Sequence, residues 1–246
     1  MNIIKELVEV PEISHNLPPI PVLPGTEGWK QVLIKECGES LVPIESHPKI
    51  LVEPVYYLRG IKGAVEKMYT REAVILRLQT VAERLPFGLA LLIWDARRPV
   101  GCQEGLFESF KTQLEKNHPD WDGERLLGET QRYVSLPSVN PNRPSPHNTG
   151  GAVDLTLADG NGQPLPMGTD FDDFSPRAGT LFFEGNAAVL SPEEFLARDN
   201  RRRLFWLMKE AGFTNYPEEW WHFDYGNQFW GKQTGEIAIY GPISPR

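Results

Sequence analysis

Two of the five histidines stand in segments whose residue types could bind a metal and catalyse hydrolysis. His147 comes seven residues before Asp154, and His222 comes three residues after Glu219. Catalytic zinc sites use three protein ligands, commonly imidazole and carboxylate, and keep one position open for water. The metal lowers the pKa of that water, and a nearby carboxylate can then move protons. Two histidines, one aspartate and one glutamate would supply such a site.

Each spacing taken alone also has an ordinary explanation. An isolated histidine is more often an exposed or hydrogen-bonded residue than a metal ligand, and Asp154 alone could be a turn or capping residue. Asp154 lies, however, within the otherwise apolar segment 152–157. A buried carboxylate needs a partner, and a metal is one of the few adequate ones. The combination therefore favours a metal site.

Two neighbouring glutamates could transfer the proton. Residues three apart on a regular strand point to opposite faces. Glu219 can approach the metal of His222 only if it lies in the bend after Pro217, before the strand begins. Glu218, four residues from His222, is the alternative that the spacing leaves open.

The spacing of apolar residues predicts the elements that carry these side chains. Val153, Leu155 and Leu157 alternate with smaller residues, which predicts a strand with one face toward the core and one toward the site. The other predicted elements are helices over about 70–85, 103–116 and 192–211, strands over 89–94, 220–225 and 236–240, and loops over 135–151 and 159–180.

This mixture of elements predicts the fold class. Strands and helices follow one another without regular alternation, which favours an α+β fold. We expect a single domain over residues 1–246, with a central, mostly antiparallel sheet flanked by helices. The clustered prolines near the start predict an extended arm over residues 1–30.

Composition and charge exclude several partner classes. The net charge is −8, from 33 acidic and 25 basic residues, which argues against nucleic acid or an anionic membrane as the partner. A small zwitterionic ligand remains compatible with it. Two cysteines are too few for a disulfide framework, and the start of the chain does not resemble a secretory signal. We therefore expect a cytoplasmic protein, and the sequence does not indicate its oligomeric state.

Four segments resemble one known family. SPHNTGGAVDLTL (145–157) resembles the signature of the D-Ala-D-Ala metallopeptidases that contains a serine, a histidine, a glycine, an alanine and an aspartate in this order, and EWWHF (219–223) resembles their E-x-W-H element. MGTDFDDFS (167–175) and WDARRP (94–99) resemble the MGTxFDxFS and D-G-Y-R-P segments of the VanX-like D-alanyl-D-alanine dipeptidases. The four segments follow the order of that family and span about residues 90–226.

The resemblance implies a zinc site of the type found in Hedgehog domains and D,D-peptidases. It implies one Zn²⁺ held by His147, Asp154 and His222, with Glu219 rather than Glu218 as general base and acid. The implied substrate is a small zwitterionic dipeptide, D-Ala-D-Ala, which would be hydrolysed to two D-alanine molecules.

The resemblance also implies roles for three further residues. Arg98 would stabilise the oxyanion, Ser145 would lie near the substrate carboxylate, and Asp172 would contact the substrate ammonium or support the pocket. From the residues alone, Arg98 could equally form a surface salt bridge, with Arg97 as the adjacent alternative. Ala96-Arg97 stands where the family has Gly-Tyr, a change that could widen or recharge the pocket.

Two other functions fit the same motifs. A D,D-carboxypeptidase or cell-wall endopeptidase would need an open cleft and, usually, export; the long loop over 159–180 favours a dipeptidase instead. A non-catalytic zinc-binding module would not need Glu219 or Arg98, so the presence of both favours an enzyme.

Overall fold

The computed structural model describes residues 17–44, 47–185 and 189–243. Its α-helices are α1 (Val55–Leu58), α2 (Glu72–Arg84), α3 (Val100–Asn117), α4 (Gly123–Tyr133), α5 (Pro192–Glu210) and α6 (Gln228–Thr234). The short 3-10 helices are η1 (Trp29–Gln31), η2 (Pro146–Thr149), η3 (Pro176–Ala178) and η4 (Phe182–Glu184). The strands are β1 (Leu41–Pro43), β2 (Ile50–Val52), β3 (Tyr69–Arg71), β4 (Leu89–Asp95), β5 (Ala152–Asp159), β6 (Thr214–Asn215) and β7 (His222–Asp224).

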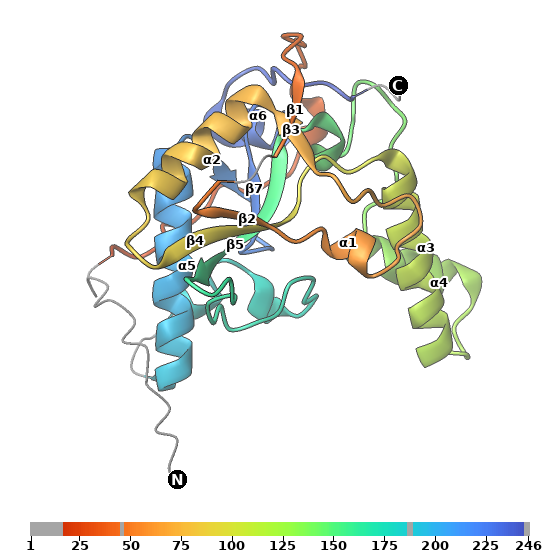
Figure 1. Ribbon diagram of the computed structural model, residues 1–246. Coiled ribbons are helices and arrows are strands. Elements are labelled where there is room, and N and C mark those ends of the chain that lie inside the picture. Colours follow the sequence, from red (N-terminus) through yellow and green to blue (C-terminus); the bar gives the residue numbers. More distant parts are fainter. Residues whose placement is uncertain (1–16, 45–46, 186–188, 244–246) are drawn as a thin grey trace.

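A five-stranded sheet forms the centre of the molecule (Figure 1). Its strand order is β2-β4-β5-β7-β6, and β1 and β3 form a separate antiparallel pair. Only β2 and β4 run parallel, while every other neighbouring pair is antiparallel. The predicted α+β fold with a mostly antiparallel sheet is therefore confirmed.

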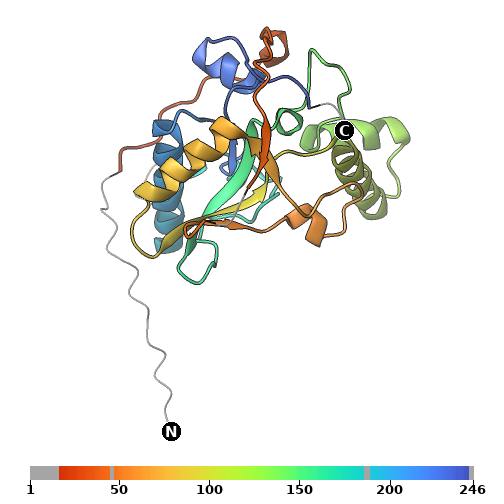
Figure 2. The same ribbon diagram turned by 45° about the horizontal axis from the view of Figure 1, so that its top comes forward.

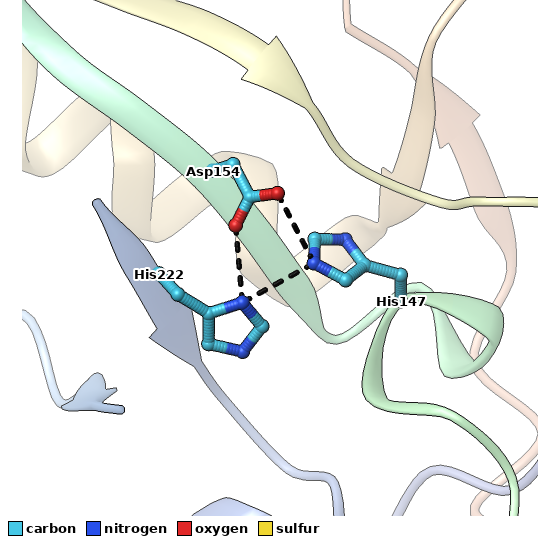
Figure 3. Close-up of side chains that lie close together, drawn as sticks. All are labelled: His147, Asp154 and His222. Atoms are coloured by element: carbon cyan, nitrogen blue, oxygen red, sulfur yellow. Dashed lines mark hydrogen bonds and ion pairs between the residues drawn. The ribbon is translucent and has the colours of Figure 1, made fainter. Parts of the chain in front are cut away.

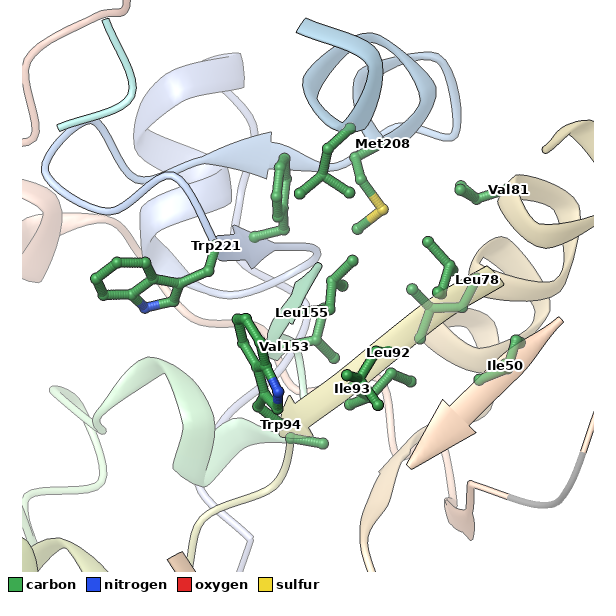
Figure 4. Packing of buried hydrophobic residues seen from close by; sticks show 14 of the residues in the cluster. Ile50, Leu78, Val81, Leu92, Ile93, Trp94, Val153, Leu155, Met208 and Trp221 are labelled. Atoms are coloured by element: carbon green, nitrogen blue, oxygen red, sulfur yellow. The ribbon is translucent and has the colours of Figure 1, made fainter. Parts of the chain in front are cut away.

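The main core lies between this sheet and two helices. Leu155 of β5 packs with Leu78 of α2 and Met208 of α5 in one buried cluster (Figure 4). β4 is buried along its whole length, as its uninterrupted apolar sequence predicts. α2 and α5 thus fix the sheet from one face, and the end of β4 leads toward the predicted site.

Helices α3 and α4 lie together, apart from α2 and α5, in both views (Figures 1 and 2). α3 is longer than predicted, and α4 was not predicted at all. Asp122 caps α4 by accepting a hydrogen bond from the backbone N–H of Arg125 at 2.8 Å. Within the described residues, no helix is long and apolar enough to span a membrane.

The predicted arm over residues 1–30 falls partly outside the described residues, which begin at residue 17. Residues 17–28 contain no helix or strand. They contact α5, since the indole N–H of Trp206 donates to the carbonyl of Pro18 at 2.8 Å. The start of α5 carries a capping box in which Ser191 and Glu194 bond each other's backbone N–H.

Two predicted strands differ from the structure. The strand predicted over 220–225 is confined to His222–Asp224, because the preceding residues form a turn. The strand predicted over 236–240 is wrong: only Ala238 forms a bridge, with Ile34. The backbone N–H groups of Ile239 and Tyr240 both donate to the carbonyl of Gly226, so the strand pairing does not continue.

Candidate active site

Sheet register places two of the three predicted metal ligands opposite each other. Asp154 of β5 pairs with His222 of β7, and His147 lies in η2, just before β5. His222 Nδ1 lies 3.0 Å from Asp154 Oδ1 and 3.2 Å from His147 Nε2. His147 Nε2 lies 3.3 Å from Asp154 Oδ2. Three buried side chains therefore converge on one point (Figure 3).

The donor atoms suit a zinc ion. Two imidazole nitrogens and a carboxylate oxygen are common zinc ligands. Nitrogen ligands at the usual zinc distance lie about 3.3 Å apart in a tetrahedral site, close to the 3.2 Å between the two histidine nitrogens. The three residues therefore fit the metal that the sequence implies.

Gly151 allows the two ligand strands to approach. A Cβ atom at this position would collide with the carbonyl oxygen of Tyr225. The backbone here is paired closely, because the N–H of Tyr225 donates to the carbonyl of Gly151 at 2.8 Å. Glycine at position 151 thus permits the close contact between the start of β5 and the segment after β7.

The ligand side chains are strongly coupled electrostatically. Burial raises the pKa of Asp154, but the imidazoles of His147 and His222 outweigh it and hold the pKa well below its usual range. Burial lowers the pKa of His222, but the carboxylates of Asp224 and Asp154 outweigh it and hold the pKa well above its usual range. The site is therefore suited to holding positive charge, as a proton or as a cation.

Glu219 lies in the turn before β7, where the sequence requires it. Its N–H donates to the carbonyl of Tyr216, and its own carbonyl accepts from the N–H of His222. Its carboxylate Oε2 lies 3.8 Å from His222 Nδ1, and the side chain is 30% exposed. Burial, opposed by His222, raises the pKa of Glu219 to about 7. Glu218 is exposed and lines the same cleft.

Arg98 is held in place from several sides. Its Nε donates to Asp95 Oδ2 and its Nη1 donates to Gln103 Oε1, each at 2.8 Å. Its Nη2 lies 3.3 Å from Asp154 Oδ2, and the guanidinium lies over the ring of Tyr56. This side chain is only 11% exposed, so the surface salt bridge considered from the sequence is not what the structure contains.

A β-bulge brings Asp95 into the same group. The register between β4 and β5 shifts between Ile93 and Asp95, which places Asp95 opposite Asp154. Asp95 Oδ2 also lies 3.2 Å from His147 Nδ1. One carboxylate therefore contacts both a predicted metal ligand and the predicted oxyanion-stabilising arginine.

The seven predicted site residues all line one broad cleft: Arg98, Ser145, His147, Asp154, Asp172, Glu219 and His222. Ser145 stands at the N-cap of η2, two residues before His147. Asp172 accepts from Tyr56 at 3.0 Å and from Arg59 at 2.7 Å. It is the one described non-glycine residue with positive φ, at 62°, and these two bonds fix it there. The individual roles of the seven residues stay predictions.

Arg97 lies elsewhere. It lines a separate small cavity with Trp94 and Cys102 and does not line the cleft. Arg97, which stands where the family has tyrosine, therefore adds no charged side chain to the lining of the cleft. Trp220 and Trp221 are both buried in the core cluster.

Three residues around Arg98 were not predicted from the sequence. Asp95 directly follows an apolar strand, a position that could have signalled a site. Gln103 and Tyr56 gave no signal, because one lies within a helix and the other lies far upstream of the motifs. Their contribution is visible only in the contacts with Arg98.

The amino-acid sequence of residues 63–239 matches the family model for D-Ala-D-Ala dipeptidases, peptidase family M15. The matched segment is most of the chain and includes all seven predicted site residues. The chain belongs to the D-Ala-D-Ala dipeptidase family. Tyr56 and Arg59 lie outside the matched segment, although both contact Asp172.

Curated members of this family align with much of the chain. A D-alanyl-D-alanine dipeptidase from Synechocystis is 30% identical over 238 residues, covering 85% of this chain and 94% of the relative. The D-alanyl-D-alanine dipeptidase from Enterococcus faecium is 33% identical over 146 residues, covering 55% and 62%. That from Escherichia coli K12 is 29% identical over 154 residues, covering 63% and 64%.

Proposed function

We propose that this protein hydrolyses D-alanyl-D-alanine to two molecules of D-alanine, using one zinc ion held by His147, Asp154 and His222. The observation that carries the proposal is the convergence of these three buried side chains beside Glu219 and Arg98. Membership of the dipeptidase family gives the substrate. The relatives compared above are themselves named D-alanyl-D-alanine dipeptidases.

Glu219 moves the protons in this proposal. Zinc bound at the three ligands would supply Lewis acidity, activating water and polarising the scissile carbonyl. Glu219 takes a proton from the attacking water and delivers it to the amine nitrogen as the C–N bond breaks. In the metal-free site burial raises the pKa of this carboxyl to about 7, and a carboxyl with a raised pKa is suited to both accepting and releasing a proton.

Arg98 stabilises the negative charge that develops on the carbonyl oxygen. Its guanidinium is fixed by Asp95 and Gln103 before substrate binds, so little reorganisation is needed when the charge appears. Its Nη2 lies beside Asp154, and so the positive charge is directed toward the metal ligands.

The two ends of the dipeptide meet different polar groups in the cleft. Ser145 lies near the substrate carboxylate, and Asp172 contacts the substrate ammonium or supports the pocket through Tyr56 and Arg59. Both carboxylate oxygens of Asp172 already accept a hydrogen bond, which supports the second of its two roles.

We further propose that residues 1–246 act as a single peptidase domain on a cytoplasmic pool of free dipeptide. The net charge of −8 supports a small zwitterionic substrate and not a nucleic acid or an anionic membrane. The native metal is proposed as zinc because the donor set is two imidazoles and one carboxylate.

Substrate length and stereochemistry test the proposal. The purified protein would be incubated with D-Ala-D-Ala, with L-Ala-L-Ala, and with an N-acetylated tripeptide ending in D-Ala-D-Ala, and free alanine would be measured. We expect release from the free D,D-dipeptide alone. Comparable turnover of the blocked peptide would instead indicate a carboxypeptidase, and turnover of the L,L-dipeptide would contradict the stereochemical assignment.

A further inference from the structure

The two histidines of the site face it with different ring nitrogens (Figure 3). His147 directs Nε2 toward the other ligands, and its Nδ1 contacts the carbonyl oxygen of Ala96 at 2.7 Å. His222 directs Nδ1 toward the other ligands, and its Nε2 lies 3.1 Å from Asp224 Oδ2. A backbone carbonyl therefore supports one ring, and a carboxylate supports the other.

Asp224 is itself held firmly. It is completely buried and lies in the last position of β7, where it pairs with Ala152 and Thr214. Its second oxygen, Oδ1, accepts from Asn227 Nδ2 at 2.5 Å. Asn227 is also completely buried, and its Oδ1 caps α6 by accepting from the N–H of Trp230 at 3.1 Å. One oxygen of the carboxylate therefore has an amide donor, and the other faces the imidazole of His222.

This arrangement decides which nitrogen of His222 is available to a metal. A neutral imidazole carries one N–H and one lone pair. An ionised carboxylate can only accept a hydrogen bond, so the proton of His222 belongs on Nε2, which lies 3.1 Å from Asp224 Oδ2. The lone pair is then on Nδ1, which faces His147 and Asp154. A carboxylate acceptor also makes the imidazole a more basic ligand.

We propose that Asp224 is a positioning residue that fixes the ring and the tautomer of His222, so that Nδ1 binds the metal, and that Asn227 holds Asp224 in register. This inference rests on the proposed zinc site. The competing role for Asp224 is purely structural, as an anchor between β7 and the start of α6.

The affinity for zinc separates the two roles. Dissociation constants would be measured by competition with a chromophoric chelator for the wild-type protein, Asp224→Asn, Asn227→Ala and a control, Asp159→Asn. Asp159 also accepts two hydrogen bonds but lies at the far end of β5. We expect Asp224→Asn to weaken zinc binding about 10- to 100-fold, Asn227→Ala to weaken it less, and Asp159→Asn to leave it unchanged.

Thermal unfolding of the metal-free proteins completes the test. Zinc affinity that falls in Asp224→Asn while the metal-free melting temperature stays near that of the wild type supports positioning. Unchanged affinity with a lowered melting temperature overturns it in favour of the structural anchor. Absence of zinc binding in the wild-type protein would overturn the proposed function itself. Zinc binding in the wild type that Asp224→Asn does not weaken would overturn only the positioning role of Asp224.

A measurement on the wild-type protein does not depend on folding of a variant. In ¹⁵N NMR spectra of histidine-labelled, zinc-loaded protein, His222 should carry its proton on Nε2 and the metal on Nδ1, while His147 should show the reverse. A proton on Nδ1 of His222 would overturn the proposal.

Discussion

Glu219 and Glu218 are adjacent carboxylates with different positions in the cleft. Glu219 approaches His222 and has a pKa of about 7, whereas Glu218 is exposed. We expect Glu219→Gln to lower kcat by about 10²- to 10⁴-fold, because an amide cannot accept the proton. Zinc content should remain at the wild-type level.

The matched control is Glu218→Gln, for which kcat should stay within a few-fold of the wild type. Steady-state hydrolysis of D-Ala-D-Ala and metal analysis of the same samples measure both quantities. If Glu218→Gln loses activity and Glu219→Gln does not, the proton transfer has been assigned to the wrong residue.

Arg98 and Arg97 form a second adjacent pair with different surroundings. Lysine at position 98 would keep the charge but lose the forked bonds to Asp95 and Gln103. We expect Arg98→Lys to lower kcat/KM by about 10²- to 10³-fold, and Arg97→Lys to change it little. Equal kcat/KM values for Arg98→Lys and the wild type would exclude the oxyanion role.

At the scale of single residues, the sequence predicted the groups whose chemistry is distinctive. An aspartate within an apolar strand, with a histidine shortly before that strand, is an unusual pattern that indicates a metal site. The support of Arg98 by Tyr56 and Gln103 could not be predicted, because tyrosine and glutamine occur in many ordinary positions and the contacts join distant segments.

At the scale of elements, the long apolar or amphipathic segments were predictable and the short ones were not. β5, α2 and α5 have periodic sequences and β4 is a continuous apolar run, and each was predicted within a few residues. The bulge between Ile93 and Asp95 depends on pairing with β5, and the Gly226 carbonyl ends the last predicted strand. Such contacts between segments have no local signal.

The start of α3 packs closely on the chain after α1, and this contact makes a prediction about stability. A Cβ atom at Gly105 would collide with the carbonyl oxygen of Lys62. We expect Gly105→Ala to lower the free energy of unfolding by about 1–3 kcal/mol, measured by urea denaturation, despite the higher helix propensity of alanine.

Gly128 of α4 is the matched control, because a Cβ there would meet no atom within 4 Å. Gly128→Ala should raise the free energy of unfolding by about 0.5–1 kcal/mol. Stabilisation by Gly105→Ala would contradict the close packing of α3 on this segment.

At the scale of the whole molecule, the proposed metal joins three separate elements. Its ligands come from η2, β5 and β7, so binding should favour the folded state over the unfolded chain. With free zinc at 100 times its dissociation constant, we expect the melting temperature to rise by about 5–10 °C. His147→Ala should remove most of that rise, and an equal melting temperature with and without zinc would contradict binding at this site.

The family motifs lie between residues 94 and 223, but the folded molecule extends the site beyond them. Tyr56 and Arg59, near α1, reach Asp172 in the loop after β5. The sequence before residue 63 gave no prediction for the site, since neither residue belongs to a recognisable spacing. Only the folded chain brings this early segment to the cleft.

The most direct test of the proposed function is the activity of chelator-treated protein with D-Ala-D-Ala as zinc is added back. The mechanism predicts no release of D-alanine without metal. As zinc is added, the activity should rise and reach its maximum at one zinc per chain. Full turnover after the metal has been removed, or stoichiometric zinc binding without turnover, would contradict it.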